Sequence, residues 1–249
     1  MSPFLPTVPP LNSPPIIALI LPVLNEAERL QACLGELMQW HDFDQIIVVD
    51  GGSSDASVEI VCKFMSSDAA MAHPILNLLQ APRGRARQLH SGALAADADV
   101  LLFLHADTIL PRTATADIRA AIQRGEIWGR FDVQLCGKNF IFRVIERCMN
   151  WRSAHTGIVT GDQAMFVRRD AYRVLGGFAP IALMEDVEFS SRLKWIASPA
   201  RLRSAVLTST RRWQQHGIPR TVLLMWSLRF LFWLGISPRR LARWYERKS

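Results

Sequence analysis

The stretch Gln45-Ile46-Ile47-Val48-Val49-Asp50-Gly51-Gly52-Ser53-Ser54-Asp55 predicts the fold, because it leads from a buried strand into a helix through a short polar turn. Four β-branched residues in a row are typical of a strand that is covered on both faces. Asp50 ends this strand with a carboxylate, and the glycines that follow allow a ligand to approach the backbone. Ser54 and Asp55 are suited to cap a helix that runs through Met65. The alternative is a plain strand-to-helix turn, because Asp, Gly and Ser are common turn residues.

The same alternation of strand and helix patterns continues on both sides of this stretch. Strands are expected at residues 16–21, 75–79 and 100–105, helices at 25–40 and 84–96, and a changed pattern from 126 onward, with strands at 128–135 and 164–168 and a helix at 139–151. Such alternation is typical of an α/β fold with a Rossmann-like, mostly parallel sheet flanked by helices. Ligands of these sheets bind beyond the carboxyl ends of the strands, which is where Asn25, Glu26, Asp50 and Asp107 fall.

The composition indicates a globular chain with a sizeable core. Of the 249 residues, 49% are hydrophobic and 20% are charged, which excludes a disordered protein. The four cysteines, Cys33, Cys62, Cys136 and Cys148, have no metal-site spacing, so we expect buried thiols in a reducing, cytoplasmic compartment. Residues 1–15 are rich in proline and are expected to form a flexible lead-in rather than a signal peptide.

The positive charge of the chain is concentrated in a C-terminal tail, residues 216–249. Residues 1–200 hold 18 Lys and Arg against 21 Asp and Glu, a balance of −3, whereas residues 201–249 hold 11 against one, a balance of +10. The stretch 222–235 is apolar nearly all round, yet it is too short to span a bilayer and contains Arg229. We expect a basic apolar helical tail in peripheral contact with an anionic membrane, on the inner face of the cell membrane. The alternative is a helix that packs against the core or a second subunit.

Arginines and carboxylates follow several of the expected strands. Arg83, Arg85 and Arg87 lie with Gly84 and Gln88 at the start of a helix, where cations oppose the helix dipole and therefore need a negative partner such as a diphosphate. Pairing with surface carboxylates is the alternative.

A single carboxylate, Asp107, follows the apolar run 100–104, where it is suited to bind Mg²⁺ or Mn²⁺. His105 is a ligand, a hydrogen-bond donor or a packing residue. Glu185 and Asp186 open a further helix, and a carboxylate there can accept a hydroxyl proton, although acids are common at helix N-termini. Asp162 and Gln163 are suited either to bind sugar hydroxyls or to stabilise a turn.

Taken together, these segments resemble the family 2 glycosyltransferases of GT-A fold, the group that includes dolichol-phosphate mannosyltransferases. Residues 22–26 (PVLNE) resemble the P-x-x-N-E motif, residues 47–55 resemble V-D-D-G-S-x-D, and residues 84–92 resemble a segment with glycine and A-R-N. Residues 105–107 (HAD) take the D-x-D position, Glu185-Asp186 the E-D position, and Arg212-Trp213 the end of Q-x-x-R-W. The strings LLFLHADT, TGDQAMFVRR, LMEDVE and TSTRRW are similar to a bacterial subgroup labelled arsenosugar biosynthesis or radical-SAM/selenodomain-associated glycosyltransferase.

The resemblance implies a GT-A catalytic domain at residues 16–215, with a nucleotide-binding half at 16–125 and an acceptor half at 126–215. It implies a hexosyltransferase that transfers a sugar from a nucleotide diphosphate donor, with inversion, to an acceptor that the sequence does not identify; a lipid-linked acceptor would suit the tail. Asp107 would hold the divalent metal and Asp186 would act as base beside Glu185. The donor-binding residues would be Pro22, Asn25, Glu26, Asp50, Gly84, Arg85, Arg87, Gln88, Arg212 and Trp213.

Two features of the sequence depart from the family pattern, and two other classes of protein fit the sequence less well. His105 replaces the first aspartate of D-x-D, and Ser209 stands where Gln or Arg is common. A nucleotidyltransferase would begin with a glycine-rich G-x-G-x-R loop, whereas residues 22–26 contain no glycine. A non-enzymatic nucleic-acid-binding protein would interleave basic and aromatic residues over the whole fold, whereas here the basic excess lies in the tail. We therefore expect no nucleic-acid partner.

Overall fold

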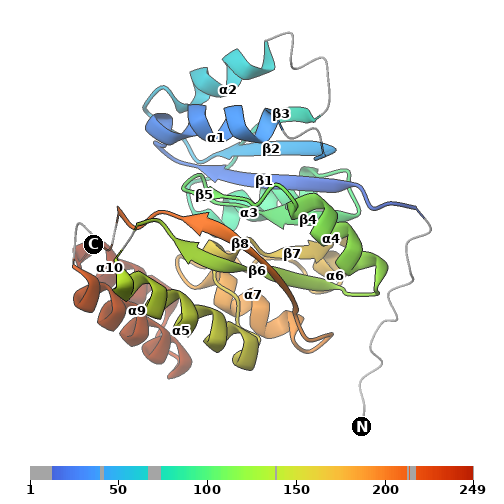
Figure 1. The fold of residues 1–249 in the computed structure, drawn as a ribbon. Coiled ribbons are helices and arrows are strands. Elements are labelled where there is room, and N and C mark those ends of the chain that lie inside the picture. Colours follow the sequence, from blue (N-terminus) through green and yellow to red (C-terminus); the bar gives the residue numbers. More distant parts are fainter. Residues whose placement is uncertain are drawn as a thin grey trace.

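The described residues are built around one mixed β-sheet. The computed structural model describes residues 13–39, 42–66, 74–137, 139–211, 213 and 217–248. The described residues form an eight-stranded sheet in the order β3-β2-β1-β4-β7-β6-β8-β5 (Figure 1). The strands are β1 (Ile17–Val23), β2 (Gln45–Asp50), β3 (Ile75–Gln80), β4 (Val100–Phe103), β5 (Thr108–Ile109), β6 (Trp128–Leu135), β7 (Phe166–Arg168) and β8 (Ala200–Thr208). Strands β1 to β4 and the pair β6/β8 run parallel, while β7 and β5 are antiparallel to their neighbours. The predicted mostly parallel α/β sheet is confirmed.

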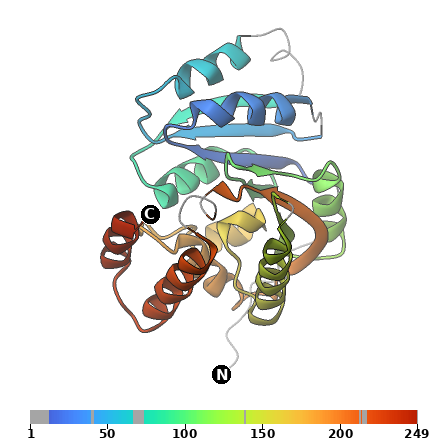
Figure 2. The same ribbon diagram turned by 60° about the vertical axis from the view of Figure 1, so that its left-hand side comes forward.

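Helices cover both faces of this sheet because its strands are apolar on both sides. In β1, Ile17, Leu19 and Leu21 enter one core, together with α1 (Ala27–Gln39), α2 (Ser57–Met65) and α4 (Ala114–Gln123). Ala18 and Ile20 point the other way, into a second core with α3 (Arg85–Ala95), α6 (Arg169–Val174) and α7 (Glu185–Leu193). The other helices of the described residues are α5 (Phe140–Thr156), the 3₁₀ turn η2 (Gly161–Gln163), α9 (Ile218–Trp233) and α10 (Pro238–Lys248). Helices α5, α9 and α10 gather at the end of the molecule opposite α2 (Figures 1 and 2).

Element boundaries agree with the predictions wherever the sequence pattern is strong. Strands β2 and β6 have the predicted bounds, whereas β4 ends at Phe103, two residues before the predicted end at His105. The short strand β5, the long strand β8 and the helices α4 and α6 had not been predicted. The predicted cap of α2 is wrong in detail: Ala56 is the N-cap residue, and Asp55 accepts hydrogen bonds from the backbone amides of Ser57 and of Ala27 in α1.

Helix α5 completes the hydrogen bonding of β6 with its side chains. Strand β7 pairs with β6 only at Trp128 and Gly129, so the rest of that edge of β6 has no strand beside it among the described residues. Asn150 donates to the carbonyl oxygen of Val133 at 3.0 Å and accepts from its amide at 2.8 Å. One turn away, the carboxylate of Glu146 accepts from the amide of Leu135. Buried backbone groups need partners, and here a helix supplies them.

The C-terminal tail is helical, as predicted, and one side of it packs on the protein. Leu228 of α9 and Leu241 of α10 are buried against Met184, with Val187 of α7 beside them. The alternative prediction, that the tail helix packs against the core, therefore holds for one side of the tail. Another side of α9 remains exposed and carries Leu223, Trp226, Phe230 and Trp233. Within the part of the chain that the structure describes, no helix is long and apolar enough to cross a membrane.

The prediction of four buried cysteines is wrong for two of them and holds only in part for the other two. Cys62 and Cys148 are exposed, while Cys33 and Cys136 are partly buried and free. Burial raises the pKa of the Cys33 thiol to about 12, so that thiol is protonated at neutral pH.

Two helical glycines provide a test of the packing between α3 and the sheet. A Cβ atom at Gly92 would lie 2.6 Å from Ile20 Cγ2 and 2.8 Å from Val49 Cγ2. At Gly35 of α1 it would meet only a ring atom of Phe64, at 4.0 Å. We expect Gly92→Ala to lower the free energy of unfolding by about 1–3 kcal/mol through overpacking. Gly35→Ala should instead raise it by roughly 0.5–1 kcal/mol, because Ala favours a helix. Urea denaturation of both variants measures the difference, and equal effects would contradict the tight packing of α3.

Candidate active site

The loops that follow β1 and β2 are bonded to each other. The side-chain oxygen of Asn25 accepts from the backbone amide of Ser54 at 2.8 Å, and the amide of Asn25 donates to the Ser53 hydroxyl at 2.9 Å. The amide of Glu26 donates to the Ser57 hydroxyl at 3.0 Å. Asn25 adopts a left-handed backbone conformation, with φ of 55°. These bonds hold the predicted nucleoside-binding residues Asn25 and Glu26 at the carboxyl end of the sheet, and Pro22 lies just before them within β1.

Asp50 uses its carboxylate to shape its own loop. The side chain is 2% exposed, and its oxygens accept from the backbone amides of Gly52 at 2.9 Å and Ser53 at 3.1 Å. Carboxylates that accept backbone amides at a turn fix the path of the chain. In this conformation Asp50 positions the loop, and direct contact with a nucleoside stays a prediction.

Gln88 joins the ends of the two central strands. Its side-chain nitrogen donates to the carbonyl oxygens of Val23, at 2.8 Å, and Val49, at 2.9 Å, and the residue is 3% exposed. Both amide protons are therefore in use, because an amide nitrogen has two. The geometry supports a role in positioning the strand ends, and donor binding by Gln88 is untested.

The arginines at the start of α3 face different neighbours. Gly84, with φ of 132°, precedes the helix. Arg85 forms an ion pair with the buried carboxylate of Glu185, at the start of α7. Arg87 instead lines a cavity of about 480 Å³ between α3 and residues 176–180, together with His90, Phe178 and Arg192. The two arginines therefore face different parts of the molecule: Arg85 faces the start of α7, whereas Arg87 faces the cavity.

The carboxylate of Asp186 is held by two backbone amides. One oxygen accepts from Gly161 at 2.7 Å and the other from Val187 at 2.7 Å. Met184, which precedes this helix start, has φ of 68°, a left-handed conformation that is costly for a residue with a side chain. The third such residue in the described chain, besides Asn25 and Met184, is Ala164, directly after η2. All three flank loops of the candidate site.

His105 brings the two halves of the site together. Its ring rests against Gly161 so closely that a Cβ atom there would lie 2.4 Å from Nε2. The pKa of His105 is lowered to about 4, mainly by burial and then by Arg85, although the carboxylates of Asp107, Asp186 and Asp162 act in the opposite direction. The ring contacts the same glycine whose amide binds the Asp186 carboxylate.

A divalent metal fits this arrangement only if the donor substrate supplies part of its coordination. Within the described ranges, no group of three or more His, Cys, Asp or Glu side chains is arranged to hold a metal. Asp107 is exposed at the strand end, and Thr108 donates to one of its oxygens at 3.3 Å. Mg²⁺ and Mn²⁺ need few protein ligands when phosphate oxygens complete the shell. Asp107 fits such a site.

Several residues of the site carried weak signals in the sequence or none. Gly161 belongs to a T-G-D-Q string that predicted Asp162 and Gln163, but not the contacts of Gly161 with His105 and Asp186. Nothing singled out Arg152 of α5, whose Nε atom is buried without a hydrogen-bond partner. Arg212, predicted to bind the donor, lies outside the described residues, whereas Trp213 is described and partly buried.

Comparison with solved structures supports the assignment of the fold. A mannosyltransferase from Pyrobaculum calidifontis in complex with GDP-Man and Mn²⁺ superposes with a TM-score of 0.60 at 18% identity, covering 81% of this chain and 59% of that one. S. aureus TarS in complex with UDP-GlcNAc gives a TM-score of 0.63 at 16% identity, covering 78% of this chain and 58% of that one. At such identities the likeness shows the GT-A fold.

Sequence comparison identifies relatives and the family. A probable glycosyltransferase, YdaM of Bacillus subtilis, is 26% identical over 231 residues, which cover 86% of this chain and 54% of that protein. A poly-beta-1,6-N-acetyl-D-glucosamine synthase of Staphylococcus aureus is 30% identical over 99 residues, covering 39% of this chain and 23% of the relative. The chain thus spans about half or less of the curated relatives it matches. Residues 18–175, more than half of the chain, match the family model described as Glycosyl transferase family 2. This chain belongs to glycosyl transferase family 2.

Proposed function

We propose that the chain transfers a hexosyl group from a nucleotide diphosphate sugar to an acceptor hydroxyl, with inversion. The observation that carries the proposal is the contact of the His105 ring with Gly161, whose amide binds the Asp186 carboxylate, beside the ion pair between Arg85 and Glu185. Loops from the nucleotide-binding half and from the acceptor half thereby share one site. Nucleotide sugars are bound in two of the similar structures, GDP-Man in one and UDP-GlcNAc in the other, which supports this class of donor.

The donor would lie at the carboxyl ends of β1 and β2. Asn25 and Glu26 would face the nucleoside, on a loop that Asp50 and Gln88 hold in place. The diphosphate would lie near Asp107 and the N-terminus of α3, where Gly84 leaves the backbone open and free amides favour anions. Trp213 and Arg212, which follow β8 in the sequence, would also contact the donor.

Asp107 would hold the divalent metal, which supplies positive charge to the departing diphosphate when bound. Asp186 would take the proton of the acceptor hydroxyl as its oxygen bonds to the anomeric carbon and the bond to the diphosphate breaks. Displacement from the face opposite the leaving group inverts that carbon. The amides of Gly161 and Val187 orient the carboxylate, each oxygen of which retains a lone pair for the hydroxyl.

Glu185 would act by positioning Asp186 rather than by contact with the acceptor. It is 2% exposed and its carboxylate is paired with Arg85. The subgroup resemblance, to arsenosugar or radical-SAM-associated glycosyltransferases, describes the setting of related chains, and we assign no acceptor from it.

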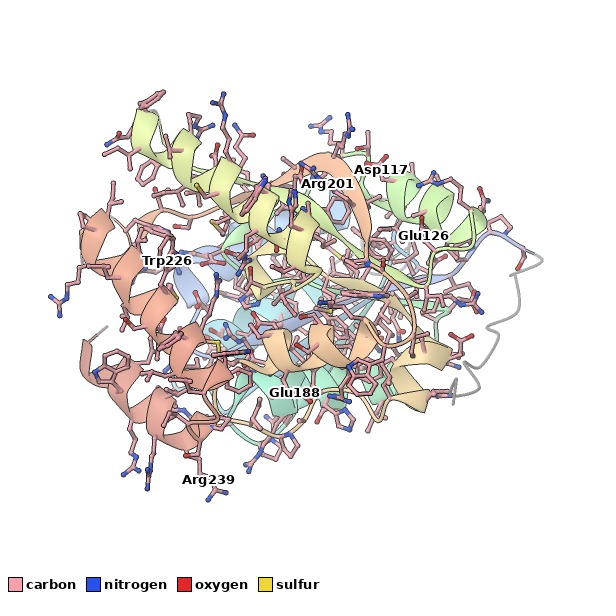
Figure 3. The ribbon with its side chains drawn as sticks, turned by 90° about the horizontal axis from the view of Figure 1, so that it is seen from below. Asp117, Glu126, Glu188, Arg201, Trp226 and Arg239 are labelled. Atoms are coloured by element: carbon pink, nitrogen blue, oxygen red, sulfur yellow. The ribbon has the colours of Figure 1, made fainter. Side chains whose placement is uncertain are left out.

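We also propose that the protein works at the inner, cytoplasmic face of the membrane. On α9 the exposed residues Leu223, Trp226, Phe230 and Trp233 follow helical spacing and form one apolar stripe. On α5 the exposed residues Phe140, Val144 and Trp151 form another. Both helices lie on the side that Figure 3 presents, which also shows Trp226 on α9 and Arg239 on α10. Apolar stripes beside arginines suit the headgroup region of anionic lipids and a lipid-linked acceptor.

The metal assignment can be tested with Asp107→Ala. Wild-type protein should gain thermal stability from GDP-mannose or UDP-N-acetylglucosamine, and Mn²⁺ should increase that gain. In the variant we expect donor affinity in Mn²⁺ to fall about tenfold or more, while affinity in EDTA stays unchanged. Asp97→Ala, at an exposed carboxylate before β4, is the control. A variant that responds to Mn²⁺ like the wild type would refute the role of Asp107.

The base assignment can be tested with Asp186→Asn. Turnover should fall by a factor on the order of 10²–10⁴, because the amide cannot take a proton. Donor affinity, measured by titration, should stay within about twofold. The amide also places an NH₂ group opposite one backbone amide, so a loss of about 1 kcal/mol of stability is expected. If donor affinity fell in parallel with turnover, Asp186 would belong to donor binding instead.

Membrane contact can be tested by flotation with liposomes of phosphatidylglycerol and phosphatidylcholine. The wild-type chain should float with anionic liposomes and less so with phosphatidylcholine alone. The double variant Trp226→Gln/Trp233→Gln should bind several-fold more weakly. Trp195→Gln is the matched control, because Trp195 is equally exposed but lies beyond the end of α7. Equal flotation of all three proteins would remove the membrane claim.

A further inference from the structure

Two half-buried arginines at the end of the molecule opposite α2 have no carboxylate partner among the described residues. Arg152 belongs to α5 and Arg229 to α9, where Leu228, the residue before Arg229, packs against Met184 at the start of α7. Neither guanidinium forms an ion pair or a hydrogen bond to a carboxylate among the described residues; the contact of Arg152 is one 3.4 Å hydrogen bond to the Thr160 hydroxyl. The Arg152 Nε atom is buried with no hydrogen-bond partner. Such unpaired buried donors are rare in native proteins and require an explanation.

The surroundings of Arg152 are electrostatically unfavourable for a second positive charge. The pKa of Arg152 is lowered to about 10, mainly by burial and then by the positive charges of Arg229 and Arg130. Asp162 and Asp186 attract the guanidinium without pairing with it. Two like charges in a partly desolvated place repel, so this arrangement is costly unless an anion joins it.

Arg152 is linked to the candidate base through two neighbouring residues, Thr160 and Gly161. Arg152 contacts Thr160, the next residue is Gly161, and the amide of Gly161 holds the Asp186 carboxylate at 2.7 Å. The second buried donor without a partner in the described chain, Nε2 of Gln163, belongs to the same turn. Arg152 is therefore linked to Asp186 through η2, which belongs to the half of the chain expected to bind the acceptor.

We propose that Arg152 and Arg229 form a subsite for a phosphate group of the acceptor, which places the acceptor hydroxyl at Asp186. This inference rests on the proposed function and names the acceptor class. Two guanidiniums carry a charge of +2, which a phosphate monoester, with about −1.5 to −2 at neutral pH, matches better than a carboxylate does. The phosphate can belong to a soluble metabolite or to a lipid headgroup, since α5 and α9 also carry the exposed apolar stripes.

The first experiment measures phosphate binding to the full chain without donor, so that its result does not depend on transferase activity. Glycerol 3-phosphate is the soluble probe, followed by thermal shift. We expect it to stabilise the wild-type protein, and Arg152→Gln or Arg229→Gln to weaken its binding at least tenfold. Arg147→Gln, at an exposed arginine of α5, is the matched control and should bind like the wild type.

The ligand-free proteins supply a second readout that separates a binding role from a structural one. Removal of one of two repelling charges should raise the melting temperature of Arg229→Gln, whereas loss of a structural contact would lower it. Donor affinity should be the same in wild type and in both variants. If donor affinity fell along with phosphate binding, the arginines would belong to the donor site and the proposal would be overturned.

Vesicles identify the source of the phosphate. Phosphatidylcholine vesicles with and without phosphatidic acid are compared for wild type and Arg152→Gln. A phosphatidic-acid-dependent gain in wild type that Arg152→Gln loses would assign a lipid phosphate, and binding of glycerol 3-phosphate alone would assign a soluble one. Absence of both effects would refute the subsite, even if donor turnover were present.

Discussion

The site depends on the ion pair between Arg85 and Glu185. Glu185 is almost completely buried, and a buried carboxylate that loses its partner costs roughly 3–5 kcal/mol. This pair links the start of α3, which follows the nucleotide-binding strands, to the start of α7, which carries Asp186. The neighbouring Met184 keeps an unfavourable backbone conformation that the surrounding packing must enforce. The distance between the two halves of the site is therefore set by electrostatics, and the orientation of Asp186 by backbone amides.

Much of the sheet could be predicted because its signals are local. The β-branched run of β2 and the alternating pattern of β6 needed no knowledge of their neighbours, and both have the predicted bounds. β8 and β5 could not be predicted in this way, since charged residues interrupt β8 and β5 has only two residues. The capping expectation for Asp55 failed because that carboxylate bonds across to the start of α1.

For the site, the sequence predicted which segments lie together, but it did not predict the hydrogen-bond partners of the individual side chains. Asp50 and Gln88 were expected to contact the donor, and the structure adds a second role that no linear motif reveals: the Asp50 carboxylate and the Gln88 side-chain nitrogen bond backbone groups of the strand ends and loop. Arg152 and Arg229 are far apart in the chain and outside every motif, and only the folded structure places α5 and α9 at the same end of the molecule (Figure 1). Gly161 could have been noted for its missing side chain, but what would fill that space is His105, 56 residues earlier.

The way α5 covers the edge of β6 has a consequence for the behaviour of the protein in solution. An uncovered strand can recruit a strand from another molecule and so start aggregation. Here Asn150 and Glu146 already occupy the amides and a carbonyl that an incoming strand would need. Because side chains of α5 make these bonds, β7 can pair with only two residues of β6 and the rest of that edge still has hydrogen-bond partners. This edge of β6 is therefore protected from pairing with a strand of a second molecule.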